Sequence, residues 1–128
     1  ERIEEQSPPK IFQVNWFRKG SDGGFLWPGF GENSRVIDWI ISRLENRSEG
    51  QQSPIGSMPQ LSELNLDGLD FAEGELEELF EVNAESWLYE VRSIEEFFDG
   101  FGDKLPQKLR AELIELETRL LQEHGARV

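Results

Sequence analysis

The chain has 128 residues, enough for one small domain, and 37% of them are apolar, which supports a modest core. Its formal net charge is −13, and residues 61–128 hold 18 Asp and Glu against six Lys and Arg. A field of this sign repels nucleic acid and anionic membranes, and no apolar run is long enough to span a bilayer, so we expect neither partner.

Few residues in the sequence are of types that carry catalysis. The chain contains no Cys and a single His, His124. A His-based metal site or a Ser–His–Asp triad therefore cannot form within it. Acidic neighbours such as Glu77 and Glu78 point apart on a helix and favour solvation over acid–base work. We expect no catalytic residue and no metal ligand in this chain, and the lack of Cys is compatible with a cytoplasmic protein.

The first quarter of the chain predicts a helix end, a strand and a turn. Residues 1–6 resemble the last turns of a helix that ends before Pro8, which suggests that the chain continues on its N-terminal side. Residues 10–17, KIFQVNWF, alternate apolar and polar side chains with a period of two, as a strand does. Residues 18–24 are rich in Gly, Ser and Asp and predict a turn.

A loop and a helix are predicted next. Residues 25–36, FLWPGFGENSRV, contain Pro and two Gly, which favour a loop. Asn33 or Ser34 is expected to cap the following helix, at about residues 35–47, because a short polar side chain accepts a bond from an orphan N–H.

The remaining chain predicts mainly helices. Residues 46–60 are expected to form a loop, and Ala72 to Val82 a short acidic helix. Asn83 is a good cap for a second helix, and Pro106 suits the first turn of a last one. In the last helix one stripe is expected to contain Leu109, Leu113, Leu116 and Leu120. The expected fold class is α/β, with one or two strands at the start followed by mainly helices, in a first region at 1–60 and an acidic helical region at 61–128.

Aromatic side chains cluster around the glycine loop. Five of them fall within 15 residues: Trp16, Phe17, Phe25, Trp27 and Phe30. Aromatic rings on such a loop suit the binding of a flat base, and the amide of Asn33 offers a donor and an acceptor to its edge. An N–H aimed at guanine O6 would meet an amino group in adenine. The alternative is a small core, which composition alone favours because buried aromatics commonly serve as core.

The same loop shows no means of holding phosphates. GFGENS, residues 29–34, has Ser where the dinucleotide fingerprint has its third Gly, and the sequence GxxxxGK followed by Ser or Thr is missing from the chain.

Longer stretches of the sequence closely resemble the C-terminal region of GTP-dependent phosphoenolpyruvate carboxykinases. The resemblance rests on KIFQVNWFRKG followed by FLWPGFGENSRV, on SPIGSMP and LNLDGLD, and on the order and spacing of the terminal helices. It covers essentially the whole chain, and FLWPGFGEN is far more specific than a short glycine pattern.

The resemblance implies part of a mixed α/β nucleotide-binding domain in a cytoplasmic enzyme that converts oxaloacetate and GTP to phosphoenolpyruvate, GDP and carbon dioxide. It assigns the guanine pocket to Trp16, Phe17, Phe25, Phe30 and Asn33. By this assignment the three phenylalanines enclose the ring and Asn33 bonds its edge. The phosphate loop and the ligands of Mn²⁺ or Mg²⁺ belong to sequence before Glu1, so the chain alone is expected to be inactive and to need that N-terminal part as partner. The alternative is a free-standing acidic helical interaction module without activity.

Overall fold

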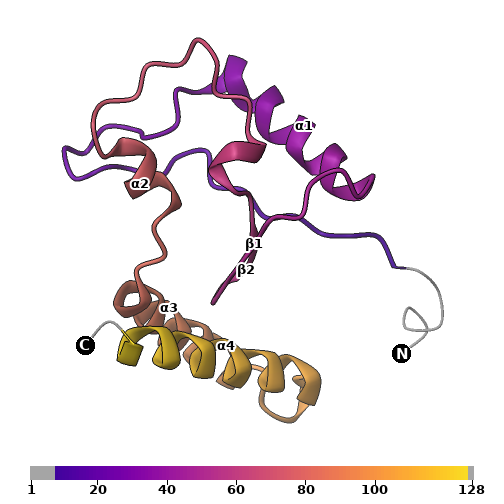
Figure 1. The fold of residues 1–128 in the computed structure, drawn as a ribbon. Coiled ribbons are helices and arrows are strands. Elements are labelled where there is room, and N and C mark those ends of the chain that lie inside the picture. The colour runs from indigo at the N-terminus through magenta and orange to yellow at the C-terminus, as the bar shows by residue number, and fades with distance from the viewer. Residues whose placement is uncertain (1–7, 127–128) are drawn as a thin grey trace. The chain divides into compact units, whose positions relative to one another are not determined.

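The computed structural model describes residues 8–126, so the helix end expected at residues 1–6 lies outside the described residues. Figure 1 shows the elements of the chain, which divides into two compact units. The first comprises residues 8–51 and 59–80, and the second comprises residues 52–58 and 81–126. Two short strands come early and the rest is mainly helical, which confirms the expected fold class.

The first unit is built around helix α1, Asn33–Leu44. This helix follows directly on a 3-10 turn at Phe30–Glu32, and it buries the indole of Trp39. It starts two residues earlier than expected and ends earlier because Asn46 takes a left-handed conformation, with φ of 57°. A shorter helix, α2, spans Glu75–Phe80 within the longer range expected for it.

The cap expected for α1 from Asn33 or Ser34 is wrong. Glu32 is the N-cap residue, and its side chain makes no capping bond. The chain is already turned before the helix begins, so the backbone N–H of Asn33 donates to the carbonyl of Phe30. The Asn33 side chain is thereby available for another contact.

The strand expected at residues 10–17 is also wrong, since none of the described residues pairs with this segment as a strand. Phe12 instead packs edge-on against Trp39, with ring centroids 6.2 Å apart. Ile11, on the other face, is 92% exposed. A period of two in the sequence indicates which side chains would lie on each face of a strand. A strand also needs a neighbouring strand for its backbone hydrogen bonds, and the sequence pattern does not show whether one is present.

The two strands lie in the segment 46–60, which was expected to be a loop. Strands β1, Gln51–Ser53, and β2, Gly56–Met58, form a hairpin. Its turn ends at Gly56, whose φ of 127° favours glycine. Three-residue strands of mostly polar side chains carry no apolar alternation, so the sequence gives little sign of them.

The second unit pairs helix α3, Ala84–Asp99, with helix α4, Gln107–Ala126, and the two lie side by side in Figure 1. Asn83 caps α3 as expected, because its Oδ1 accepts a 2.9 Å bond from the N–H of Ser86. The helix core consists of Ala84, Val91 and Leu120, with partly buried Trp87, Leu88, Leu113 and Leu116 around it. Three of the four leucines expected in the α4 stripe therefore reach the core, whereas Leu109 is half exposed. No helix in residues 8–126 is long and apolar enough to cross a membrane.

Candidate functional site

An open cleft of about 630 Å³ lies within the first unit. Its volume falls in the range of about 300–1,000 Å³ that is usual for small-molecule sites. The lining residues are Trp16, Phe17, Phe25, Trp27, Pro28, Gly29, Phe30 and Asn33. The structure thus brings to one cleft all five residues that the resemblance assigned to the pocket, together with Trp27 of the aromatic cluster and with Pro28 and Gly29.

The phenylalanine rings of the cleft are exposed. Phe17 and Phe25 contact each other edge to face, with centroids 5.9 Å apart and an angle of 63° between their planes. Their side chains are mostly exposed, and Phe30 is 95% exposed. A small aromatic core would bury these rings, so the three of them do not form one. Only Trp27 among the cleft aromatics is buried.

A tight turn brings Phe17 and Phe25 together. Lys19 and Phe25 form an isolated antiparallel bridge, and the N–H of Gly20 donates to the carbonyl of Gly24 over 2.8 Å. A Cβ on Gly20 would lie 2.9 Å from the end of the Leu26 side chain, so a larger residue at this position would require that side chain to shift. The expected Gly-rich turn therefore positions the two rings.

The loop that carries Phe30 depends on its glycine and on an ion pair. Gly29 has a φ of 110°, a conformation that residues with a Cβ rarely adopt, and its carbonyl accepts from the N–H of Glu32 over 3.0 Å. Glu32 pairs with Arg35 of α1. Arg35 also donates to the carbonyl of Asn65 over 2.8 Å, which fixes the start of α1 against a second loop of the same unit.

Asn33 is held by a neighbouring tryptophan. The indole N–H of Trp27 donates to Oδ1 of Asn33 over 2.8 Å. An indole N–H can only donate, so the atom that faces it is the amide oxygen. The Nδ2 group keeps both N–H donors, and no described residue accepts a bond from them. Sequence reasoning did not find this contact, although a buried indole usually requires an acceptor close by.

Among residues 8–126, no charged side chain lines the cleft. Beside the cleft, Nζ of Lys19 lies 5.8 Å from the centroid of the Phe25 ring. A neutral aromatic cleft with one amide suits a flat polar ring better than a phosphate group, which requires cations or clustered N–H donors. Within residues 8–126, no three His, Asp or Glu side chains are grouped as a metal site requires.

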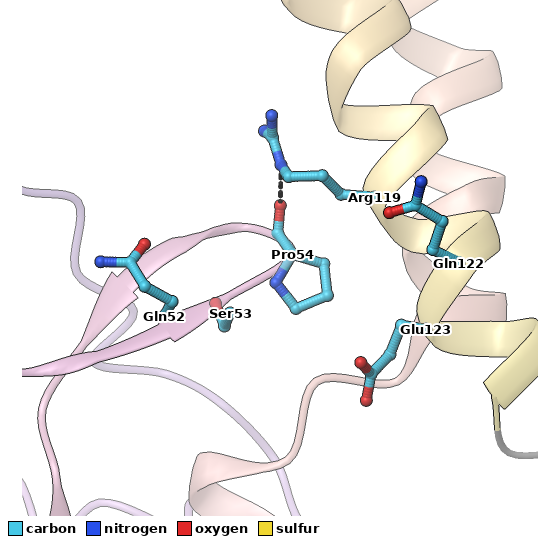
Figure 2. A pocket seen from close by; sticks show the side chains of 6 residues that line it. All are labelled: Gln52, Ser53, Pro54, Arg119, Gln122 and Glu123. Carbon is cyan, nitrogen blue, oxygen red and sulfur yellow. Dashed lines mark hydrogen bonds between the residues drawn. The ribbon is translucent and has the colours of Figure 1, made fainter.

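A second, shallower hollow of about 310 Å³ lies within the second unit. Figure 2 shows it between the hairpin and α4, lined by Gln52, Ser53, Pro54, Arg119, Gln122 and Glu123. Nε of Arg119 donates to the carbonyl of Pro54 over 2.9 Å, so this guanidinium is engaged in holding the hairpin turn. None of the described residues that line this hollow is aromatic, so they offer no ring on which a base would stack.

Comparison with known proteins identifies a family for nearly the whole chain. Residues 1–119 match the family model of the phosphoenolpyruvate carboxykinase C-terminal P-loop domain. The phosphoenolpyruvate carboxykinase (GTP) of Renibacterium salmoninarum is 46% identical over 117 residues, which are 91% of this chain. The protein of the same name from Neocallimastix frontalis is 48% identical over 122 residues, or 94% of this chain.

These relatives are much longer than the region that matches. The match covers 19% of the Renibacterium protein and 20% of the Neocallimastix protein. The resemblance expected from the sequence is confirmed by the family match and by the level of identity. The chain therefore belongs to the family of GTP-dependent phosphoenolpyruvate carboxykinases and corresponds to part of its C-terminal domain.

Proposed function

We propose that this chain recognises the guanine base of GTP and GDP within a GTP-dependent phosphoenolpyruvate carboxykinase. That enzyme converts oxaloacetate and GTP to phosphoenolpyruvate, GDP and carbon dioxide. The observation that carries the proposal is the cleft in which exposed phenylalanine rings surround an asparagine amide with unused N–H donors.

The phenylalanines supply the attraction for the base. Phe17, Phe25 and Phe30 present exposed rings at one cleft, and a base stacked on an aromatic side chain gains about 1–3 kcal/mol. Stacking does not distinguish guanine from adenine, because both have a π-face. These rings therefore account for affinity and not for selectivity.

Asn33 supplies the selectivity. Its Oδ1 is occupied by Trp27, so Nδ2 remains to donate to the edge of the base. Guanine carries the acceptor O6 at the position where adenine carries an amino group. A donor left facing another donor in a desolvated site costs about 1–3 kcal/mol. The amide therefore favours guanine over adenine.

Catalysis and phosphate binding are assigned by this proposal to residues outside the chain. In the described part of the chain the cleft has no cationic lining residue, and the net charge of −13 repels phosphates. No three His, Asp or Glu side chains within residues 8–126 are grouped to hold Mn²⁺ or Mg²⁺, so the proposal assigns the metal ligands to the rest of the enzyme. Phosphoryl transfer needs cations that neutralise developing charge, so this chain alone is expected to be inactive.

The partner implied by this division is the rest of the enzyme. The unpaired segment 10–17 has the alternation of a strand, with Ile11 almost fully exposed on one face. An apolar side chain exposed in this way is suited to be covered by the N-terminal part. The lack of Cys agrees with a cytoplasmic enzyme.

The binding of GDP and ADP to the full-length enzyme that contains this chain tests the proposal. By titration calorimetry, Asn33→Ala is expected to lower the preference for GDP over ADP by about 1–3 kcal/mol, since it removes the edge donor. Phe30→Ala serves as the control and is expected to weaken both nucleotides alike through lost stacking. An unchanged GDP-to-ADP ratio in Asn33→Ala would reject the role of Asn33. A wild-type enzyme that binds neither nucleotide would favour the acidic interaction module instead.

A further inference from the structure

We propose that Trp27 is a positioning residue that fixes the Asn33 amide with its NH₂ group toward the base, and so sets the selectivity for guanine. This inference rests on the proposed function of the cleft. Trp27 is almost entirely buried and contacts Asn33, the residue that we propose bonds the edge of the base.

The contact leaves the amide one favourable orientation. Trp27 is 5% exposed, and its Nε1–H donates to Asn33 Oδ1 over 2.8 Å. Turning the amide by half a rotation would put Nδ2 against the indole N–H, so that two donors would face each other. The indole cannot adjust, because its nitrogen has no lone pair to accept with. The buried donor therefore selects the orientation in which Nδ2 remains for the ligand.

An asparagine without this neighbour would not discriminate between the bases. Its amide would turn its N–H₂ toward guanine O6 or its oxygen toward the adenine amino group, with similar ease. Wild-type selectivity on this account requires both the amide and the indole that orients it. A site in which Asn33 alone were present would bind either purine through the same side chain.

Removal of the indole donor gives a distinctive expected result. In the full-length enzyme, Trp27→Phe is expected to lower the affinity for GDP about twofold, since roughly half of the amides would be turned away. The affinity for ADP is expected to rise about tenfold, because a turned amide accepts from the adenine amino group. A gain of ADP affinity separates this role from general damage, which would weaken both ligands.

Trp39→Phe provides a matched control. Trp39 is also a buried tryptophan of the first unit, and its Nε1–H donates to Glu63 Oε2 over 2.9 Å. The same substitution there removes an indole donor that does not contact Asn33. It is expected to leave the GDP-to-ADP ratio as in the wild type. If both tryptophan variants shift the ratio equally, the positioning role of Trp27 is overturned.

A double substitution separates this inference from the proposed function. Asn33→Asp replaces the amide by a carboxylate with two equivalent oxygens, so a half-turn of this side chain makes no difference. Because a carboxylate can only accept, it bonds the adenine amino group, and ADP is expected to be preferred over GDP. Adding Trp27→Phe to Asn33→Asp is then expected to leave the GDP-to-ADP ratio unchanged. If Asn33→Asp does not alter the ratio, the guanine function itself fails and the inference with it.

If Asn33→Asp alters the ratio but Trp27→Phe alone does not, only the inference is overturned. The inference is also overturned if Trp27→Phe shifts the GDP-to-ADP ratio by the same factor in the wild-type enzyme and in the Asn33→Asp variant. Benzothienylalanine in place of Trp27 keeps the ring shape and removes only the N–H. It is expected to give the same ratio as Trp27→Phe, and it provides the measurement if the phenylalanine variant does not fold.

Discussion

A single carboxylate organises the loop that follows α1. Glu63 accepts bonds from the backbone N–H groups of Glu49, Gly50 and Gln60 and from the indole of Trp39, over 2.8–3.1 Å. These donors stabilise the charged form of the carboxylate, with the Gly50 N–H contributing most, and lower the pKa of Glu63 from 4.5 to about 2. The ionised side chain therefore ties the two ends of the segment 49–60 to α1 through Trp39.

This network predicts an acid-sensitive contribution to stability. The pKa of Glu63 is lower in the folded state, so the contribution is fully present above about pH 4.5 and is lost as the pH falls toward 2. Glu63→Gln is expected to lower the unfolding temperature at pH 7 and to weaken its dependence on pH between 4.5 and 2. Thermal unfolding of the full-length enzyme over this range, with exposed Glu73→Gln as the matched control, measures the effect. Equal pH profiles for the wild type and Glu63→Gln would contradict it.

At the scale of single residues, the sequence predicted which residues line the cleft, but it did not predict how they contact one another. Asn33 and the phenylalanines were expected at one pocket from the resemblance, and the structure brings them to one cleft. The bond from Trp27 to Asn33 was not predicted. It depends on how the turn before α1 folds, and residues six positions apart in a loop have no fixed spacing in space.

At the scale of elements, the helix-start residues and the leucine stripe predicted the helices of the second unit, because the pattern and the packing agree. Helices α3 and α4 each have an apolar face, and these faces meet at Val91 and Leu120. The alternation at residues 10–17 led to a wrong prediction of a strand, because a strand also needs a neighbouring strand to pair with. The hairpin β1–β2 was missed because its strands are short and mostly polar.

The cap of α3 makes a measurable contribution to that helix pair. Oδ1 of Asn83 accepts from the N–H of Ser86, so Asn83→Ala leaves a helix-end donor without its protein partner. The substitution is expected to lower the free energy of unfolding by about 0.5–2 kcal/mol. Asn83→Asp keeps the acceptor and is expected to retain most of this stability. Urea unfolding of both variants of the full-length enzyme tests the cap, and equal stability of Asn83→Ala and wild type would refute it.

At the scale of the whole molecule, binding and charge are distributed unevenly. Residues 61–128 carry 18 of the 26 acidic side chains, whereas the lining of the cleft is neutral. The charge disfavours phosphates, and the neutral aromatic lining suits a base. The region that matches the Renibacterium relative covers 19% of that protein, and the part of the reaction that we propose for it is recognition of the nucleotide base.

A structure of the full-length enzyme with bound GDP tests this account most directly. The account predicts that the guanine ring lies against Phe17, Phe25 and Phe30, with O6 within hydrogen-bonding distance of Asn33 Nδ2 and the bond from Trp27 to Asn33 kept. A guanine ring bound away from this cleft, or an Asn33 amide that turns its oxygen toward the base, would contradict it.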